Sequence, residues 1–195
     1  MTKLKSTRFI RKTKYVIYKQ TILKPEDHLW TFIGAFLGIG IIASIQSHFL
    51  SHTENVILIG SFGASAVLVY GATNSPLAQP RNLIGGHIIS AIVGVTVMQF
   101  LPILHFEWLA SSLAVAIAIV AMQITKTMHP PGGATALIAT IGSEKIHALG
   151  YFYVISPVFI GVIILFIVAL VFNNIPKDRQ YPVKPISLRK YITKQ

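Results

Sequence analysis

Residues 29–50 read LWTFIGAFLGIGIIASIQSHFL, a run of 22 residues without a charged side chain. An α-helix rises about 1.5 Å per residue, so about 20 apolar residues cross the roughly 30 Å hydrocarbon core of a bilayer. This run predicts a membrane-spanning helix. It is too long for the apolar region of a signal peptide and no small-residue cleavage site follows it, so we expect it to stay as a span.

Further apolar stretches follow along the chain, and two of them are short. Together they predict an all-α membrane protein, a six-span helical bundle. The six expected spans cover residues 29–50, 56–72, 83–104, 108–125, 130–142 and 151–172. A short apolar segment also suits a re-entrant or broken helix. The alternative is therefore four full spans plus two re-entrant segments.

Charge patterning gives the orientation. The chain has 195 residues and a net charge of +11, and its basic residues gather in the segments 1–28 and 173–195, which flank a neutral transmembrane domain at 29–172. Lys and Arg favour the cytoplasmic side, so both ends are expected there, in the cell (inner) membrane. The number of crossings is then even. Such flanks suit a lipid bilayer better than nucleic acid.

An internal similarity links the two short stretches. Gly60–Leu68 reads GSFGASAVL and Pro130–Ile138 reads PPGGATALI, with Gly-Ala-Ser/Thr-Ala in common. Each lies between two longer spans. Three spans per half are an odd number, so the second half would cross in the opposite sense, as a 3+3 inverted repeat. Coincidence stays open, because small residues are common in packed membrane helices.

Both short stretches contain helix breakers, so each predicts a helix that begins inside the membrane. A helix start leaves backbone N–H groups unpaired and carries a partial positive charge, which suits a small inorganic anion. Hydroxyl groups one turn later add donors. The expected substrate-binding residues are His129, Pro130, Pro131, Gly132, Gly133, Ala134, Thr135, Ser61, Phe62, Gly63 and Ser65.

Other polar residues are candidates for a pathway or gate. His87 lies inside the third expected span, where an ionisable residue is a functional candidate. His129 could share a proton with the anion, as a proton-coupled anion carrier would require. A polar inner loop follows the second span and contributes Asn74, Ser75, Arg81 and Asn82. Tyr151 and Tyr153 have the character of interface anchors. Without cysteine, and with histidines at spacings unsuited to a metal, we expect no metal site and no cofactor.

The stretch Thr127–Leu137, TMHPPGGATAL, resembles the signature of the HPP family of integral membrane proteins. Gly60–Leu68, the loop Asn74–Asn82 and Gly85–His87 resemble its second hallmark, and the resemblance covers about residues 25–183. The family is usually described as four-spanning, whereas spacing and charge here favour six. Some members resemble nitrite transporters, so the resemblance implies a transporter or channel for a small monovalent anion such as nitrite. Some relatives carry an added soluble domain, for which this chain has no room.

Two other classes stay open. A structural or regulatory subunit of a membrane complex is compatible with the small size, and so is a homodimer. An intramembrane enzyme is less favoured, because the spans contain no Asp, Glu or Cys. Ser61 and His129 could pair, but no third group is evident to orient them, so no catalytic residue is assigned.

Overall fold

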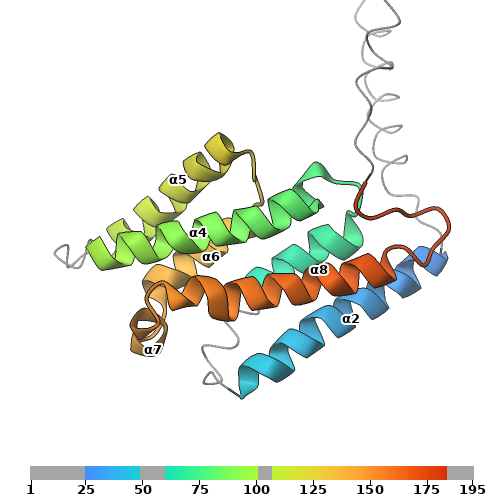
Figure 1. Cartoon of the computed structure of the whole chain (residues 1–195), viewed down its shortest axis with the longest axis horizontal. Coiled ribbons are helices and arrows are strands. Elements are labelled where there is room, and N and C mark those ends of the chain that lie inside the picture. Colours follow the sequence, from blue (N-terminus) through green and yellow to red (C-terminus); the bar gives the residue numbers. More distant parts are fainter. Residues whose placement is uncertain (1–24, 49–59, 101–106, 184–195) are drawn as a thin grey trace, which may run out of the picture.

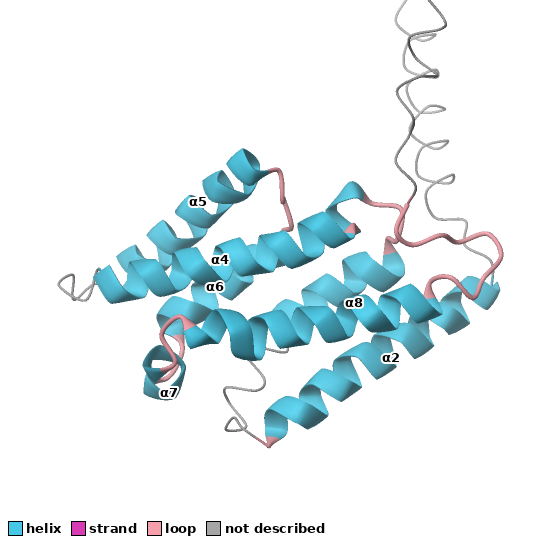
Figure 2. Cartoon of the chain, in the orientation of Figure 1, coloured by secondary structure: helices cyan, strands magenta, loops and turns pink. Residues whose placement is uncertain are grey.

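A computed structural model describes residues 25–48, 60–100 and 107–183, which form helices and loops without a strand (Figure 2). The helices, in order, are α2 (Pro25–Ser47), a helix at 60–66 that continues into η1 (Val67–Gly71), η2 (Pro76–Ala78), α4 (Pro80–Phe100), α5 (Glu107–Thr125), α6 (Pro131–Ile141), α7 (Glu144–Ala148), η3 (Val154–Phe159) and α8 (Ile160–Phe172). The predicted all-α class is confirmed. The basic tails at 1–24 and 184–195, and the predicted span ends at 49–50, 56–59 and 101–104, lie outside the described residues.

Among the residues that the structure describes, four helices are long and apolar enough to cross a membrane: Pro25–Ser47, Pro80–Phe100, Trp108–Thr125 and Val154–Phe172. They correspond to the four long spans expected from the sequence. The apolar helices Gly60–Gly71 and Pro131–Ile141 are shorter. The 11 residues of α6 rise about 17 Å, roughly half of a hydrocarbon core.

Local sequence explains where α2 begins and where the last long helix bends. α2 starts at Pro25, four residues before the apolar run, because proline suits a first helical position and Glu26 and Asp27 suit a first turn. Near the start of the last long helix, Ser156 has extended backbone angles (φ −134°, ψ 121°). Pro157 follows it and lacks the N–H that an unbroken helix would use.

Two groups of three helices make up the bundle (Figure 1). α4 packs on α5 and α6, whereas α8 packs on α2 and on the helix that ends in η1. Glycine allows close approach in both groups. A Cβ on Gly94 of α4 would lie 2.6 Å from the Ala136 carbonyl oxygen of α6, and one on Gly34 of α2 would lie 2.9 Å from the Tyr70 ring.

Polar contacts mark one end of the bundle. The Arg179 guanidinium lies 2.9 Å from the Asp27 carboxylate and so joins the segment after α8 to the start of α2. Arg81, at the start of α4, donates to the Thr125 carbonyl at the end of α5 (2.9 Å). This end therefore holds residues 25–31, 71–82, 125–128 and 172–183.

Different contacts mark the opposite end. The Thr96 hydroxyl lies 2.9 Å from that of Tyr151, and the Ser111 hydroxyl lies 3.3 Å from that of Thr140. The end of α4 therefore meets the segment just before η3, and the start of α5 meets the end of α6.

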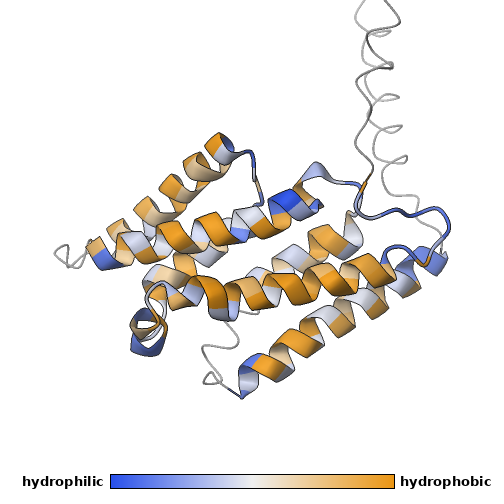
Figure 3. Cartoon of the chain, viewed as in Figure 1, coloured by the Kyte–Doolittle hydropathy of each residue, from blue (hydrophilic) through white to orange (hydrophobic). Residues whose placement is uncertain are grey.

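Large apolar side chains cover the outside of the long helices (Figure 3). Phe32 and Phe36 on α2 are each 66% exposed, and Ile124 on α5 is 76% exposed. Apolar patches of this kind are unusual on a protein surrounded by water, whereas lipid chains accommodate them. Loops and helix ends carry the hydrophilic residues (Figure 3).

Tyr181 packs at the end of the bundle that holds the Asp27–Arg179 ion pair. Its buried hydroxyl donates to the Ala78 carbonyl oxygen (2.8 Å), and burial raises the pKa of the Tyr181 phenol, which keeps it a donor. Tyr181→Phe would leave that carbonyl unpaired. We expect it to lower the free energy of unfolding by about 1–2 kcal/mol, measured by thermal unfolding in detergent. Tyr151→Phe is the control, because that hydroxyl bonds at an exposed site. Equal losses in the two variants would contradict the expectation.

Candidate functional site

Five polar side chains meet inside the bundle, and we call them the histidine–hydroxyl cluster. Each is at most 2% exposed. They come from three regions of the sequence, at 61–65, 87 and 129–135. The members are Ser61 and Ser65 from the helix at 60–66, His87 from α4, His129 from the loop before α6, and Thr135 from α6.

Short distances connect the cluster. The Ser65 hydroxyl oxygen lies 2.7 Å from Nε2 of His87 and 3.0 Å from Nε2 of His129. The other ring nitrogen of His87, Nδ1, lies 2.7 Å from the Thr135 hydroxyl, which in turn lies 2.8 Å from the Ser61 hydroxyl. The two short helices are thus joined through side-chain hydrogen bonds.

A backbone carbonyl sets the tautomer of His129. Its Nδ1 lies 2.8 Å from the Leu77 carbonyl oxygen, which can only accept, so Nδ1 carries the proton. In a neutral ring Nε2 then accepts, and the Ser65 hydroxyl donates to it. The Ser61 carbonyl oxygen lies 3.2 Å from the Ser65 hydroxyl and is a second acceptor, but Nε2 of His129 is nearer, at 3.0 Å. With its one proton on His129, Ser65 accepts from His87, which places the His87 proton on Nε2.

The same reasoning orders the rest of the cluster. With the proton of His87 on Nε2, its Nδ1 accepts from the Thr135 hydroxyl. Thr135 in turn accepts from Ser61. All the donors therefore point one way, from Ser61 through Thr135, His87, Ser65 and His129 to the Leu77 carbonyl.

Aromatic rings and small residues surround the cluster. The ring of Phe62 lies 5.6 Å from that of His87, and the two imidazole rings lie 4.9 Å apart, centroid to centroid. A Cβ on Gly132 would lie 2.7 Å from the Ser90 hydroxyl oxygen and 2.9 Å from the Gly86 carbonyl oxygen. Only glycine at 132 therefore lets the start of α6 lie directly against α4.

The backbone N–H groups at the start of α6 are hydrogen-bonded, although we expected them to be unpaired. Gly132 N–H donates to the His129 carbonyl (2.8 Å) and Gly133 N–H to the Pro130 carbonyl (3.0 Å). Pro130 and Pro131 have no N–H. The expectation of unpaired amides at Gly132 and Gly133 is therefore wrong, because a tight turn pairs them. Donors for a ligand here are side chains.

Of the eleven residues expected to bind substrate, the structure brings Ser61, Ser65, His129 and Thr135 together and packs Phe62 against them. Pro131 and Gly132 are buried beside the cluster. The Pro131 carbonyl oxygen lies 3.2 Å from the Ser61 hydroxyl oxygen, so it is an alternative acceptor to Thr135 for the Ser61 proton. The others lie further out. Pro130 is exposed, whereas Gly63, Gly133 and Ala134 are half-buried.

The expected pathway residues divide in the same way. His87 is central to the cluster, but Asn74, Ser75, Arg81 and Asn82 lie at the end of the bundle. Only Asn74 and Ser75 are in a loop, because α4 already begins at Pro80 and includes Arg81 and Asn82. Asn82 donates to the Met128 carbonyl (2.9 Å), and Ser75 accepts from the Leu77 N–H (3.2 Å). Arg81 bonds the end of α5, and Asn74 is exposed. Arg81 and Asn82 thus connect the start of α4 to the end of α5 and the loop that follows it, and the hydrogen bonds of these four residues do not reach the cluster.

Two contributors were not foreseen from the sequence. Tyr153, expected as an interface anchor, is fully buried, and its hydroxyl donates to the Thr135 carbonyl (3.1 Å). That expectation is wrong, because η3 packs on α4 rather than facing the interface. The Leu77 carbonyl is the second contributor. No sequence signal marks a carbonyl, and a tyrosine at a span end looks the same whether it faces lipid or the core.

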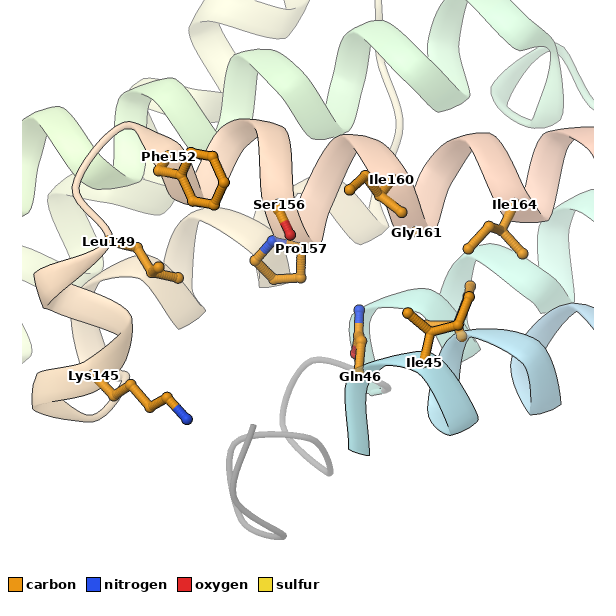
Figure 4. A pocket seen from close by; sticks show the side chains of 11 residues that line it. Ile45, Gln46, Lys145, Leu149, Phe152, Ser156, Pro157, Ile160, Gly161 and Ile164 are labelled. Carbon is orange, nitrogen blue, oxygen red and sulfur yellow. The ribbon is translucent and has the colours of Figure 1, made fainter. Parts of the chain in front are cut away.

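A cavity of about 440 Å³ lies between α2, α7 and the last long helix (Figure 4). Its lining is apolar apart from Gln46, Lys145 and Ser156. Gly161 lines it too, and a Cβ there would lie 2.5 Å from the ring of Phe62. The ring of Phe62 therefore packs against Gly161 of the cavity wall as well as against His87.

Gly161→Ala tests that placement. The added methyl must displace the buried Phe62 ring, and overpacking of this kind costs about 1–3 kcal/mol. We expect a lower unfolding temperature in detergent. Gly40→Ala on α2 is the control, since no atom lies within 4 Å of its Cβ, and its unfolding temperature should stay unchanged. A Gly161→Ala variant as stable as Gly40→Ala would show that Phe62 does not pack there.

Four long apolar helices, an exposed apolar surface and a buried polar centre define a multi-pass membrane protein. Residues 20–182 match the family described as HPP, transmembrane region, and the chain belongs to that family. Within residues 25–48, 60–100 and 107–183 no group of three His, Cys, Asp or Glu side chains could hold a metal ion.

Two transmembrane proteins of Dictyostelium discoideum are similar. One is 44% identical and the other 43%, each over 159 residues, or 81% of this chain. The alignments cover 51% and 55% of those proteins, so the chain spans about half the length of the curated relatives it matches. No solved structure matches the chain.

Proposed function

We propose that this chain is a transporter or channel for a small monovalent anion such as nitrite. The observation that carries the proposal is the hydrogen-bonded contact between Ser61 and Thr135, which joins the two short helices around a pair of histidines. Polar and ionisable groups inside a membrane protein are costly and mark substrate or ion pathways. Nitrite itself comes from the resemblance to the HPP family.

The chemistry of the cluster suits a small anion. Hydroxyl and imidazole N–H groups are hydrogen-bond donors, and the positive end of α6 points toward them. An entering anion would exchange the bonds that these groups make with one another for bonds to its own oxygen atoms. The cluster contains no carboxylate that would repel it.

Packing supports six crossings arranged as an inverted repeat. The proposed repeat relates α2 to α5, the helix at 60–71 to α6, and α4 to α8. α4 packs on α5 and α6, and α8 packs on their counterparts α2 and η1. If each helix is replaced by its counterpart, the same pairs of helices are therefore in contact. Ser61 contacts Pro131, its equivalent 70 residues later, as expected for positions near a two-fold axis.

The ends of the bundle support the orientation. The first turn of α2 and the segment after α8 meet at the Asp27–Arg179 ion pair, on the same end as Arg81. With the basic flanks, this favours cytoplasmic termini in the cell membrane. Asn74, Ser75, Arg81 and Asn82 would then lie at the inner mouth. The cavity beside Gln46 would be the outer approach, with Phe62 as its barrier.

Anion flux into proteoliposomes tests the proposal. Purified full-length chain is reconstituted, and uptake of nitrite, nitrate, formate and chloride is compared with that of protein-free vesicles. We expect saturable uptake of at least one of them, nitrite foremost. If none of the four enters faster than in protein-free vesicles, the proposal fails.

A subunit of a larger complex is the second candidate function, and the exposed apolar faces of α2 and α5 favour it. These faces suit lipid, a second copy of the chain or another membrane protein. Purification in mild detergent separates the alternatives. A stable monomer or homodimer with anion flux supports the transporter, whereas dependence on a co-purifying partner supports the subunit. An enzyme is less favoured, because no carboxylate orients the cluster histidines.

A further inference from the structure

A buried anion needs a positive charge beside it. Removing an ion from water into an apolar interior is very costly unless an opposite charge compensates it. Among the described residues, the buried polar side chains are Gln46, Ser61, Ser65, Thr73, His87, Ser90, Thr127, His129, Thr135, Thr140 and Asn173. None of them is Lys or Arg. In the cluster, only the two histidines can become positive.

The groups that face the histidines are otherwise neutral. The helix at 60–71 presents Ser65 and the ring of Phe62, and α6 presents Thr135. η3 is preceded by Tyr153, whose hydroxyl reaches the Thr135 carbonyl, and α5 contributes Met122 beside Gly86 of α4. Each imidazole also faces the other. No carboxylate among the described buried residues would hold a proton on either ring when the anion is absent.

From these observations we propose that the histidine–hydroxyl cluster takes up one proton with each anion, so that the chain is an electroneutral anion–proton cotransporter. This inference rests on the proposed function and names its coupling ion. One proton is expected rather than two, because the imidazole rings are 4.9 Å apart and two positive charges would repel.

The ordered hydrogen bonds also supply a route for the proton. A proton that arrives on the Ser61 oxygen releases the original Ser61 proton to Thr135, Thr135 passes its own to Nδ1 of His87, and His87 passes its Nε2 proton to Ser65. Ser65 then passes its proton to Nε2 of His129. Each transfer follows an existing hydrogen bond of 2.7–3.0 Å, and the net result is a positive His129. The relay leaves the His87 proton on Nδ1, so before the next cycle the hydroxyls must rotate back and the His87 proton must return to Nε2.

The test measures protons and charge per anion in proteoliposomes that contain the full chain. Nitrite and nitrate are the probes, a pH-sensitive dye reports internal protons, and potassium with valinomycin sets the membrane potential. We expect one proton per anion, uptake driven by an alkaline interior at zero potential, and no response to potential at equal pH. Protein-free vesicles correct for permeation of the undissociated acid.

The outcomes separate the two proposals. Uptake that follows the membrane potential and moves no proton overturns the coupling and leaves the transporter standing. Absence of uptake of every anion overturns both. A double variant, His87→Gln with His129→Gln, keeps amide donors but cannot carry a proton, and we expect it to lose proton movement entirely. One proton per anion in that variant would overturn the role of the cluster.

If the double variant does not fold, ring-nitrogen NMR of the wild-type protein tests the ordered proton route instead. With neutral rings, we expect the proton on Nε2 of His87 and on Nδ1 of His129. Any other pair of tautomers would overturn the ordered route.

Discussion

Gly132→Ala is expected to disrupt the contact between α4 and α6 and to abolish anion transport. The new methyl would lie 2.7 Å from the Ser90 hydroxyl and 2.9 Å from the Gly86 carbonyl oxygen. A backbone oxygen cannot rotate away, so α6 must move, and the loss of stability should reach or exceed the upper end of the usual 1–3 kcal/mol for overpacking. Thermal unfolding in detergent measures the loss, and flux into proteoliposomes measures transport.

The neighbouring glycine provides a matched control for that substitution. A Cβ on Gly133 meets only the Val115 side chain, at 3.9 Å, which is an ordinary contact. Gly133→Ala should therefore unfold at the wild-type temperature or slightly above it, since alanine favours a helix more than glycine does. If the two alanine variants behave alike, α6 does not begin against α4 as described.

Thr135→Val should greatly reduce the transport rate while changing the volume of the side chain very little. The Thr135 hydroxyl joins Ser61 to Nδ1 of His87, and valine has nearly the same volume but no donor or acceptor. An unpaired buried group costs about 1–3 kcal/mol. If that cost falls on the transport step, the rate drops by on the order of 100-fold, since each 1.36 kcal/mol is a factor of ten. Flux into proteoliposomes at matched protein content measures it.

Thr140→Val is the control on the same helix. Thr140 is also buried, but its hydroxyl donates to the Leu137 carbonyl and contacts Ser111, away from the cluster. Its transport rate should stay within about threefold of wild type, because its loss leaves no cluster group unpaired. Equal loss in the two valine variants would mean that helix stability, rather than the cluster, controls the flux.

Local patterns were sufficient to predict the four long helices and the two short apolar ones, but not α7 or η2. The apolar run at 29–50 lies mostly within α2, and the Pro-Pro-Gly-Gly run marks where α6 begins, because proline and glycine interrupt a helix. His87 and His129 stand out in the sequence as ionisable residues in or beside apolar stretches. These features depend on residues close together in the chain.

The arrangement of the cluster depends on distant residues and could not be predicted. Ser65 bridges two histidines that are 22 and 64 residues away. Tyr153 reaches Thr135 only because η3 packs on α4. The paired amides of Gly132 and Gly133 reflect a tight turn, whereas the motif alone left those groups unassigned.

The central claim is that the anion binds at the histidine–hydroxyl cluster, and ring-nitrogen NMR of histidine-labelled protein in lipid tests it most directly. The chain has 7 histidines, so His87→Gln and His129→Gln variants assign the two signals. With rising nitrite, the signals of His87 and His129 should shift together and saturate, toward the protonated form, and Thr135→Val should weaken the effect. Nitrite transport without any change in these two signals would contradict the account.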